Sequence, residues 1–385
     1  MHRRTFLCTA LTPLLRAAPK QDIAGFERPR VLRNAARYLA DAPVTVTATQ
    51  SPRSAGGAHD FFSEGDYWWP DANHPDGPYV QRDGMTNPDN FVAHRQALMG
   101  LSVRMPALTA AWLLTHEKRY ANKAAEHLRA WFIDEKTRMN PHLQYAQAIH
   151  GRTTGRGTGV IDTIHLVEVA QAIPFVAAAH ALTPAELAVV KGWFVEYTAW
   201  MTTSKNGIEE RDTKNNHATC WGMQVAAFAK LTGNIQLMAD VRKRYKTVYI
   251  PDQEGPDGSF PKELARTKPY GYSLFNLDAM ATICQILSSP QDDLWRWQTD
   301  DGRGIAKAVA YLYPFIANKA AWPKPPDVMY YDKWPMRQAA LLFGGLAFNQ
   351  PGYIETWRKL PADSEVEEVI RNFFIRQPVL WLPAT

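Results

Sequence analysis

Apolar residues recur at intervals of three and four along most of the chain from His94 onward, the spacing that places them on one face of an α-helix. Alternating runs typical of β-strands are almost absent. This periodicity predicts helices over residues 94–114, 117–133, 161–181, 184–203, 217–231, 235–249, 274–288, 303–318, 337–347 and 365–374, with a shorter one upstream over 30–39. The pattern therefore predicts an all-α fold.

Two similar segments indicate that helical hairpins repeat along the chain. Ala110-Ala111-x-x-Leu114-Thr115 and Ala227-Phe228-x-x-Leu231-Thr232 each end one predicted helix and lead into the next. Such hairpins bury their apolar faces only against neighbouring hairpins, which favours a ring of helix pairs. Because no linker divides residues 19–385, we expect one domain with the architecture of an incomplete α/α toroid.

The first 18 residues have the order of an export signal. Arg3-Arg4 precede Phe6-Leu7 and an apolar run that ends at residue 15, and two alanines follow. This order resembles a twin-arginine signal peptide. The apolar run is too short to span a bilayer, so we expect a periplasmic or secreted protein without a membrane span.

The charge balance makes nucleic acid a poor candidate partner. Removing residues 1–18 takes away Arg3, Arg4 and Arg16 and no acids, so the formal charge falls from +5 to +2 (5 − 3). No block of five or six basic residues is present. Attraction to an acidic polymer would have to come from locally placed cations.

Cysteine and histidine spacing predicts neither a metal site nor a bound cofactor. Neither Cys-x-x-Cys nor His-Glu-x-x-His occurs. Cys220 and Cys284 lie in apolar helical patterns. Export would permit a disulfide between them, but we favour the interpretation that both are buried free thiols.

Residues 52–90 are rich in Gly, Pro, Asp and Asn, and they carry Tyr67-Trp68-Trp69. Flexible linkers do not usually hold adjacent tryptophans, so we expect a long ordered loop. Its aromatic rings either stack on sugar rings or pin the loop to the domain. We call residues 52–90 the aromatic loop.

Two polar segments each precede an apolar helix. The first is Lys214-Asn215-Asn216-His217, in which either Asn can cap the helix that follows. The second runs over residues 263–272 and contains Arg266, Tyr270 and Tyr272. Polar loops that open onto helices of one ring can face a common groove.

Asn215-Asn216-His217-x-x-x-Trp221, followed about fifty residues later by Arg266 and Tyr272, resembles the helical-toroid alginate lyases and their relatives that act on other polyuronates. The resemblance extends over most of the mature chain, including the aromatic loop, residues 87–95 and residues 155–159. It implies a polysaccharide lyase whose catalytic residues are Asn216, His217, Arg266 and Tyr272. The interval from Arg266 to Tyr272 is one residue shorter than in the classical mannuronate lyases, which leaves Tyr270 as a rival for the tyrosine.

The chemistry of uronate β-elimination explains these residue types. The proton on C5 becomes acidic only when the neighbouring carboxylate is neutralised, which Asn216 and a bidentate Arg266 can do, with help from His217. Tyr272 can act as base, acid or both when the proton and the leaving group share one face of the sugar, as in mannuronate. When they lie on opposite faces, His217 is the natural base and Tyr272 the acid. A nearby guanidinium is expected to lower the pKa of Tyr272.

A second set of residues is expected to bind the sugar chain through stacking, hydrogen bonds or ion pairs with further carboxylates. For each of them a purely structural role is also open. The set comprises Trp68, Trp69, Asn90, His94, Arg95, Gln147, Arg156, Asn215 and Tyr270.

The favoured substrate is alginate, particularly its mannuronate-rich regions, with glucuronan close behind, and the protein is expected to be a monomer. One alternative is a glycoside hydrolase that uses acids from Glu209, Glu210 and Asp212. A solvated charged turn is the simpler explanation of these three acids, because Lys205, Arg211 and Lys214 lie next to them. The other alternative is a protein that binds an acidic glycan without cleaving it.

Overall fold

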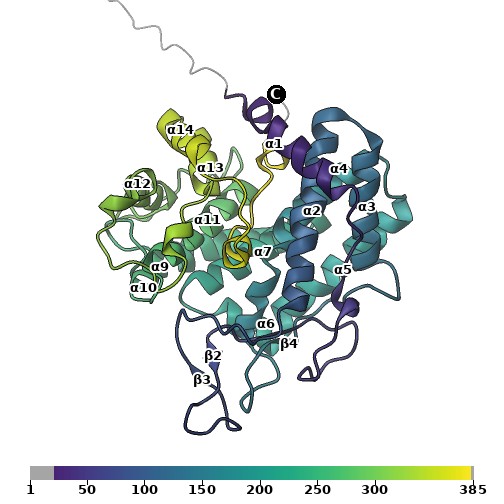
Figure 1. The fold of residues 1–385 in the computed structure, drawn as a ribbon. Coiled ribbons are helices and arrows are strands. Elements are labelled where there is room, and N and C mark those ends of the chain that lie inside the picture. The colour runs from purple at the N-terminus through teal and green to yellow at the C-terminus, as the bar shows by residue number, and fades with distance from the viewer. Residues whose placement is uncertain (1–20, 383–385) are drawn as a thin grey trace, which may run out of the picture.

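The structure is a computed structural model that describes residues 21–382, and it consists mainly of α-helices arranged in an open ring (Figure 1). The expected signal over residues 1–18 lies outside the described residues. Five largely buried helices contact one another in chain order and form the inner layer of the ring. These are α2 (Ala93–Thr115), α4 (Leu166–Ala178), α7 (Asn216–Thr232), α11 (Pro269–Leu287) and α13 (Ala339–Ala347). The expected all-α toroid is confirmed.

An outer layer of helices packs against the inner one. Each outer helix contacts the inner helix before or after it in sequence, which is the hairpin arrangement that the repeated segments predict. The outer helices are α3 (Lys118–Phe132), α5 (Pro184–Thr203), α8 (Ile235–Arg244), α12 (Ile305–Ala317) and α14 (Pro351–Lys359). At the opening of the ring, α1 (Ile23–Tyr38) contacts both α2 and the 3₁₀ turn η6 (Pro378–Leu380).

Local sequence signals account for several helix boundaries. The Thr183 hydroxyl accepts from the backbone N–H of Glu186 at 3.2 Å, and the Glu186 carboxylate accepts from the N–H of Thr183 at 2.8 Å. This capping box starts α5 at Pro184, as expected. Pro269 starts α11 five residues earlier than periodicity predicted, because proline suits the first turn of a helix. Tyr270 and Tyr272 therefore lie in a helical first turn and not in a loop.

Other boundaries differ from the prediction. The helix expected over 161–181 begins as the 3₁₀ segment η2 (Gly157–Thr163), and the one expected over 235–249 ends in the π-helix η3 (Tyr245–Tyr249). Of four further short helices, three are too brief or too polar to show clear periodicity and were not predicted. These three are α6 (Lys205–Arg211), α9 (Ile250–Gln253) and α10 (Pro261–Leu264). The fourth, α15 (Glu367–Asn372), is shorter than the range 365–374 that was predicted for it. Further 3₁₀ turns are η1 (Val46–Ala48), η4 (Lys319–Ala321) and η5 (Tyr331–Lys333).

The aromatic loop is ordered by short strands at one end of the ring (Figure 1). Strand β1 (Phe62–Glu64) pairs in parallel with β4 (Tyr145–Ala148). Strand β2 (Trp68–Trp69) pairs antiparallel with β3 (Val80–Gln81) and forms a hairpin. These pairings hold the loop across the end of the helical ring, where the polar segments before α7 and α11 also lie.

Two helical stretches, Ala93–Thr115 and Gly157–Ala178, are long and apolar enough to cross a membrane, but 67% and 78% of their most apolar windows are buried within the protein. Burial of this extent is what core helices of the ring require. Cys220 and Cys284 are both buried and free, which confirms the favoured reading of these thiols.

Candidate active site

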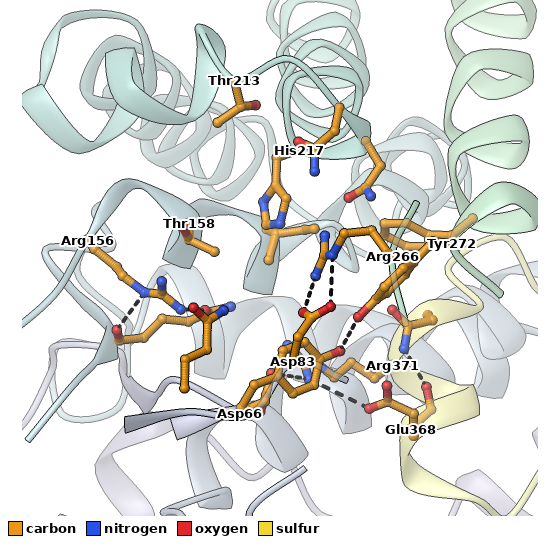
Figure 2. Close-up of a pocket in the computed structure, with 18 residues that line it drawn as sticks. Asp66, Asp83, Arg156, Thr158, Thr213, His217, Arg266, Tyr272, Glu368 and Arg371 are labelled. Atoms are coloured by element: carbon orange, nitrogen blue, oxygen red, sulfur yellow. Dashed lines mark hydrogen bonds and ion pairs between the residues drawn. The ribbon is translucent and has the colours of Figure 1, made fainter. Parts of the chain in front are cut away.

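A cavity of about 590 Å³ lies at the end of the ring that carries the aromatic loop. Its walls come from the start of α7, the segment from residue 266 into α11, the β4–η2 region, the aromatic loop and α15. Figure 2 shows His217 pointing into this space, with Arg156 on one side and Arg266 and Tyr272 on the other. Within it the structure brings together all four residues proposed for catalysis, namely Asn216, His217, Arg266 and Tyr272.

His217 is oriented by a buried acid. Its Nδ1 lies 2.7 Å from Oε1 of Glu210, whose side chain is only 1% exposed. An ionised carboxylate only accepts hydrogen bonds, so Nδ1 carries the proton and Nε2 is directed to the cavity. Glu210 sits on α6, which packs against α7, so the acid that stood as a hydrolase candidate is bonded to the histidine.

Asn216 is held by a second buried acid, Glu263. The Glu263 carboxylate accepts from the backbone N–H of Asn216 at 2.7 Å and from its Nδ2 at 2.6 Å. Burial raises the pKa of Glu263, and the two bonds from Asn216 oppose that rise. Asn215 is the N-cap residue of α7, but its side chain makes no capping bond. Glu263 therefore takes over the role of a cap from another segment, and a carboxylate at this helix end is favourable.

The guanidinium of Arg266 is paired with Asp83 of the aromatic loop (Figure 2). Nη2 donates to Oδ1 at 2.6 Å and Nε donates to Oδ2 at 3.1 Å. Burial alone would raise the pKa of Asp83, but the hydrogen bonds and charge of Arg266 outweigh it and lower that pKa. The bidentate geometry is the one that an arginine uses to hold any carboxylate.

Tyr272 lies beside Arg266 and is bonded to a second tyrosine. Its hydroxyl is 2.7 Å from the hydroxyl of Tyr67, and the Arg266 guanidinium carbon is 4.7 Å from its ring centre. Burial raises the pKa of Tyr272, and the charge of Arg266 only partly offsets that effect. The expected lowering of this pKa is therefore wrong for the ligand-free protein, because burial of the hydroxyl outweighs the charge of Arg266.

Charges of both signs line the cavity. Arg371 of α15 pairs with Asp66 and, at 3.5 Å, with Asp162, while Glu368 pairs with Lys268 at 3.0 Å. Arg156 donates to the carbonyl oxygen of Gln147 at 3.2 Å and to its Oε1 at 2.8 Å. Among the residues that the structure describes, it forms no ion pair, so Arg156 is the cavity-lining arginine whose charge is available to a ligand.

The chain matches the protein-family model described as alginate lyase over residues 45–322, which is most of its length. The chain belongs to the alginate lyase family. It is accordingly a polysaccharide lyase, and family membership favours this function over the glycoside hydrolase and the non-catalytic binding protein.

Solved structures of alginate lyases share the fold of this family member. An alginate lyase from Bacteroides ovatus is 31% identical with a TM-score of 0.81, and the match covers 94% of this chain and 95% of that one. Alginate lyase A1-III from Sphingomonas species A1 is 14% identical with a TM-score of 0.50, covering 92% and 95%. A variant of alginate lyase A1-III complexed with a tetrasaccharide is 15% identical with a TM-score of 0.56, covering 94% of each chain. No curated protein sequence matches significantly.

Three of the second set of expected ligands line the cavity of this lyase, namely Gln147, Arg156 and Asn215. Gln147 has a φ of 51°, and its backbone N–H donates to Ser63 Oγ at 2.8 Å. Its carbonyl oxygen and its Oε1 both accept from Arg156, so Gln147 orients the arginine.

Three other expected ligands, Asn90, His94 and Arg95, do not line the cavity, because each is buried and already bonded. Asn90 Nδ2 donates to the carbonyl oxygen of Gly65 at 3.0 Å. His94 accepts the N–H of Phe62 at 2.9 Å and donates to the carbonyl oxygen of Thr49 at 2.7 Å. His94 thereby holds Phe62 of the aromatic loop against α2, whereas the bond of Asn90 lies within the loop.

Arg95 is the strongest of these anchors. It pairs with Asp66 and with Asp162, the latter at 3.0 Å, and it donates to the carbonyl oxygen of Glu64 at 2.6 Å. Because its N–H groups bond to these three buried partners, Arg95 has no pair of donors available to bind a ligand carboxylate. Arg95 thus stabilises the residues that form the cavity wall and does not line the cavity itself.

Trp68, Trp69 and Tyr270 also lie outside the cavity lining. The Trp69 indole donates to the carbonyl oxygen of Met85 at 2.9 Å, which joins two parts of the aromatic loop. The guanidinium carbon of Arg156 lies 5.9 Å from the Trp68 ring centre. Tyr270 is buried, and its hydroxyl donates to the carbonyl oxygen of Phe315 at 3.1 Å. The structure therefore leaves Tyr272, and not Tyr270, facing the cavity.

Sequence reasoning missed the acids that hold the reaction centre. Asp83 and Glu263 both lay in segments already singled out, yet nothing local distinguished them from solvated loop acids. Their contacts to Arg266 and Asn216 span 183 and 47 residues. Only the closed ring reveals these pairs.

Proposed function

We propose that this protein cleaves alginate at a 1,4-linked uronate by metal-free β-elimination, leaving a 4,5-unsaturated sugar at the new non-reducing end. The observation that carries the proposal is the convergence of Asn216, His217, Arg266 and Tyr272 on one cavity. Family membership supports the reaction type.

The substrate carboxylate would be neutralised by donors from two segments. Arg266 offers a bidentate fork once its resting partner Asp83 is replaced. Asn216 Nδ2 has two hydrogens, of which Glu263 accepts one, so the other is available to the substrate. Both donors stabilise the negative charge that grows on the carboxylate as the C5 proton leaves.

Proton transfer would be carried out by Tyr272 and His217. The raised pKa of Tyr272 keeps its hydroxyl protonated in the resting protein, ready to protonate the departing glycosidic oxygen. For mannuronate the Tyr272 hydroxyl gives its proton to the departing glycosidic oxygen while its own oxygen takes the C5 proton, so the residue ends protonated again. For guluronate His217 Nε2 accepts the C5 proton and Tyr272 protonates the departing oxygen.

We propose a preference for mannuronate-rich alginate, with glucuronan as the alternative polymer that the same four residues can process. Arg156 supplies a cation for a second carboxylate along the chain. We also propose that the protein is exported by its twin-arginine-like leader and acts as a monomer in the periplasm or outside the cell.

The test is to offer mature protein polymannuronate, polyguluronate and glucuronan separately and to follow the ultraviolet absorbance of the conjugated product. A rise that is fastest with polymannuronate is expected. A rise with glucuronan alone would change the substrate but keep the reaction. New reducing ends without absorbance would contradict β-elimination.

Treatment with a chelator is expected to leave the rate unchanged. Within residues 21–382, no group of three or more His, Cys, Asp or Glu side chains is placed to hold a metal ion, and arginine and amide donors are proposed to carry the charge instead. The measurement is the initial rate before and after incubation with EDTA and gel filtration. A loss that Ca²⁺ or Zn²⁺ restores would contradict the metal-free proposal.

Glu210→Gln is expected to lower kcat by roughly tenfold or more, because the neutral amide no longer stabilises a protonated His217. The effect should be larger on polyguluronate, where His217 is the proposed base, than on polymannuronate. Glu209→Gln is the matched control, since that neighbouring acid is exposed and its partner is the exposed Lys205 at 3.6 Å. Equal losses on both polymers, with an unchanged pH profile, would mean that Glu210 only supports the fold.

A further inference from the structure

Asp83 occupies the Nε–Nη2 edge of Arg266, an edge through which a guanidinium can grip a substrate carboxylate. Within residues 21–382, the side-chain hydrogen bonds of Arg266 all go to Asp83, through Nη2 at 2.6 Å and Nε at 3.1 Å. These are the two parallel bonds with which a guanidinium grips one carboxylate. A second carboxylate cannot take the same fork while Asp83 remains, because the two like charges would lie side by side.

The resting pair is fitted into the loop and is not a chance surface contact. Asp83 lies in the turn that follows β3, and Thr267 Oγ1 donates to its Oδ2 at 3.0 Å. The next residue, Gly84, has a φ of +75° and approaches Thr267 so closely that a side chain there would collide with it. Asp83 is thereby held next to Arg266 in the ligand-free protein.

A tethered carboxylate competes at a high effective concentration. A group on the same chain faces its partner at a local concentration in the millimolar range or above, so a single free uronate competes poorly for Arg266. A polymer that is also held at Arg156, which has no resting ion pair among the described residues, gains the extra binding needed to replace Asp83.

We infer that Asp83 is a specificity-determining residue, an internal carboxylate that holds Arg266 until a polyuronate replaces it and so selects long chains over single uronates. The inference rests on the proposed function, because it takes the ligand of the cavity to be a uronate. In the ligand-free protein, Asp83 thus competes with the substrate carboxylate for Arg266.

The experiment compares the full-length protein with Asp83→Asn, which keeps the shape of the side chain and removes its charge. The probe is the methyl glycoside of glucuronic acid, which has no 4-linked sugar and cannot be cleaved, titrated by calorimetry. Asp83→Asn is expected to bind the probe about tenfold more tightly or better. Asp76→Asn is the matched control, because it removes one negative charge from an exposed site of the same loop and should leave affinity unchanged.

Two further variants secure the result. Asp83→Ser removes the carboxylate with a smaller side chain and is expected to tighten binding as Asp83→Asn does, should the amide disturb folding. Asp83→Glu keeps a carboxylate and is expected to keep the weak binding of the wild type. The KM for long alginate should change less than the affinity for the single uronate in both neutral variants.

Unchanged or weaker probe binding by both neutral variants would overturn the inference, since Asp83 would then only position Arg266. That failure is separate from failure of the proposed function. Wild-type turnover of a polyuronate together with unchanged probe affinity defeats the inference alone. Tighter probe binding without unsaturated product from any polyuronate defeats the proposed function alone.

Discussion

Tyr272→Phe is expected to lower kcat by at least about a thousandfold, because one hydroxyl is proposed both to accept and to donate a proton, and each such role typically contributes roughly 10²-fold to 10⁴-fold. The phenylalanine ring keeps the contact with the Arg266 guanidinium, so binding of alginate should be little changed. The measurement is kcat from product absorbance, paired with a direct titration of binding.

Tyr270→Phe is the matched control for this prediction. Tyr270 lies two residues earlier in the same first turn of α11, but it is buried and donates to the carbonyl oxygen of Phe315. Its loss should reduce stability by about 1 kcal/mol through the missing hydrogen bond while the rate stays near normal. A near-normal rate for Tyr272→Phe, or a collapse for Tyr270→Phe alone, would show that the proton-transfer residue has been assigned wrongly.

Arg266→Ala is expected to lower kcat/KM by about a thousandfold or more, since a charged bidentate donor aimed at developing charge is among the largest single contributions to catalysis. We expect kcat to fall and KM to rise, whereas Tyr272→Phe should lower kcat and leave binding little changed. Part of the loss comes from Asp83, which would remain in the cavity as an unpaired acid and repel the polymer.

A double-mutant cycle separates these contributions. Arg266→Ala/Asp83→Ala should recover some of the lost affinity but little of the lost kcat, so the two substitutions will not be additive. Arg296→Ala removes a cation whose side chain is 75% exposed and serves as the surface control. If Arg266→Ala kept a normal kcat and changed only KM, the arginine would bind substrate without stabilising the transition state.

The helical ring was predictable because its information is local. Periodicity located the inner helices and four of the five outer ones, but it missed α14, and the Thr183 capping box fixed the start of α5. What local patterns missed were short or irregular elements, such as the polar helix α6 that carries Glu210 and the π-helical turn η3. Both elements are packed against α7 and other neighbours that lie elsewhere in the sequence, and such tertiary contacts override weak local propensity.

The reaction centre was predictable only in part. Two polar segments before helices indicated Asn216, His217, Arg266 and Tyr272, and the structure gathers them. The same reasoning proposed His94 and Arg95 as sugar ligands. The polar atoms of both side chains instead bond to buried groups that lie far away in sequence. A side chain free to bind a ligand and one already satisfied look alike in a sequence, because the difference is made by long-range contacts.

The cavity joins parts of the chain that are far apart, with Tyr67 bonded to Tyr272 across 205 residues and Arg371 to Asp162 across 209. Contacts of such long range form slowly, because the entropy of closing a long segment must be lost before they stabilise anything. The helical hairpins depend on neighbours in sequence and can assemble earlier. Catalytic competence is therefore expected to arrive late in folding, when the two ends of the ring come together, and a partly folded chain would be helical but inactive.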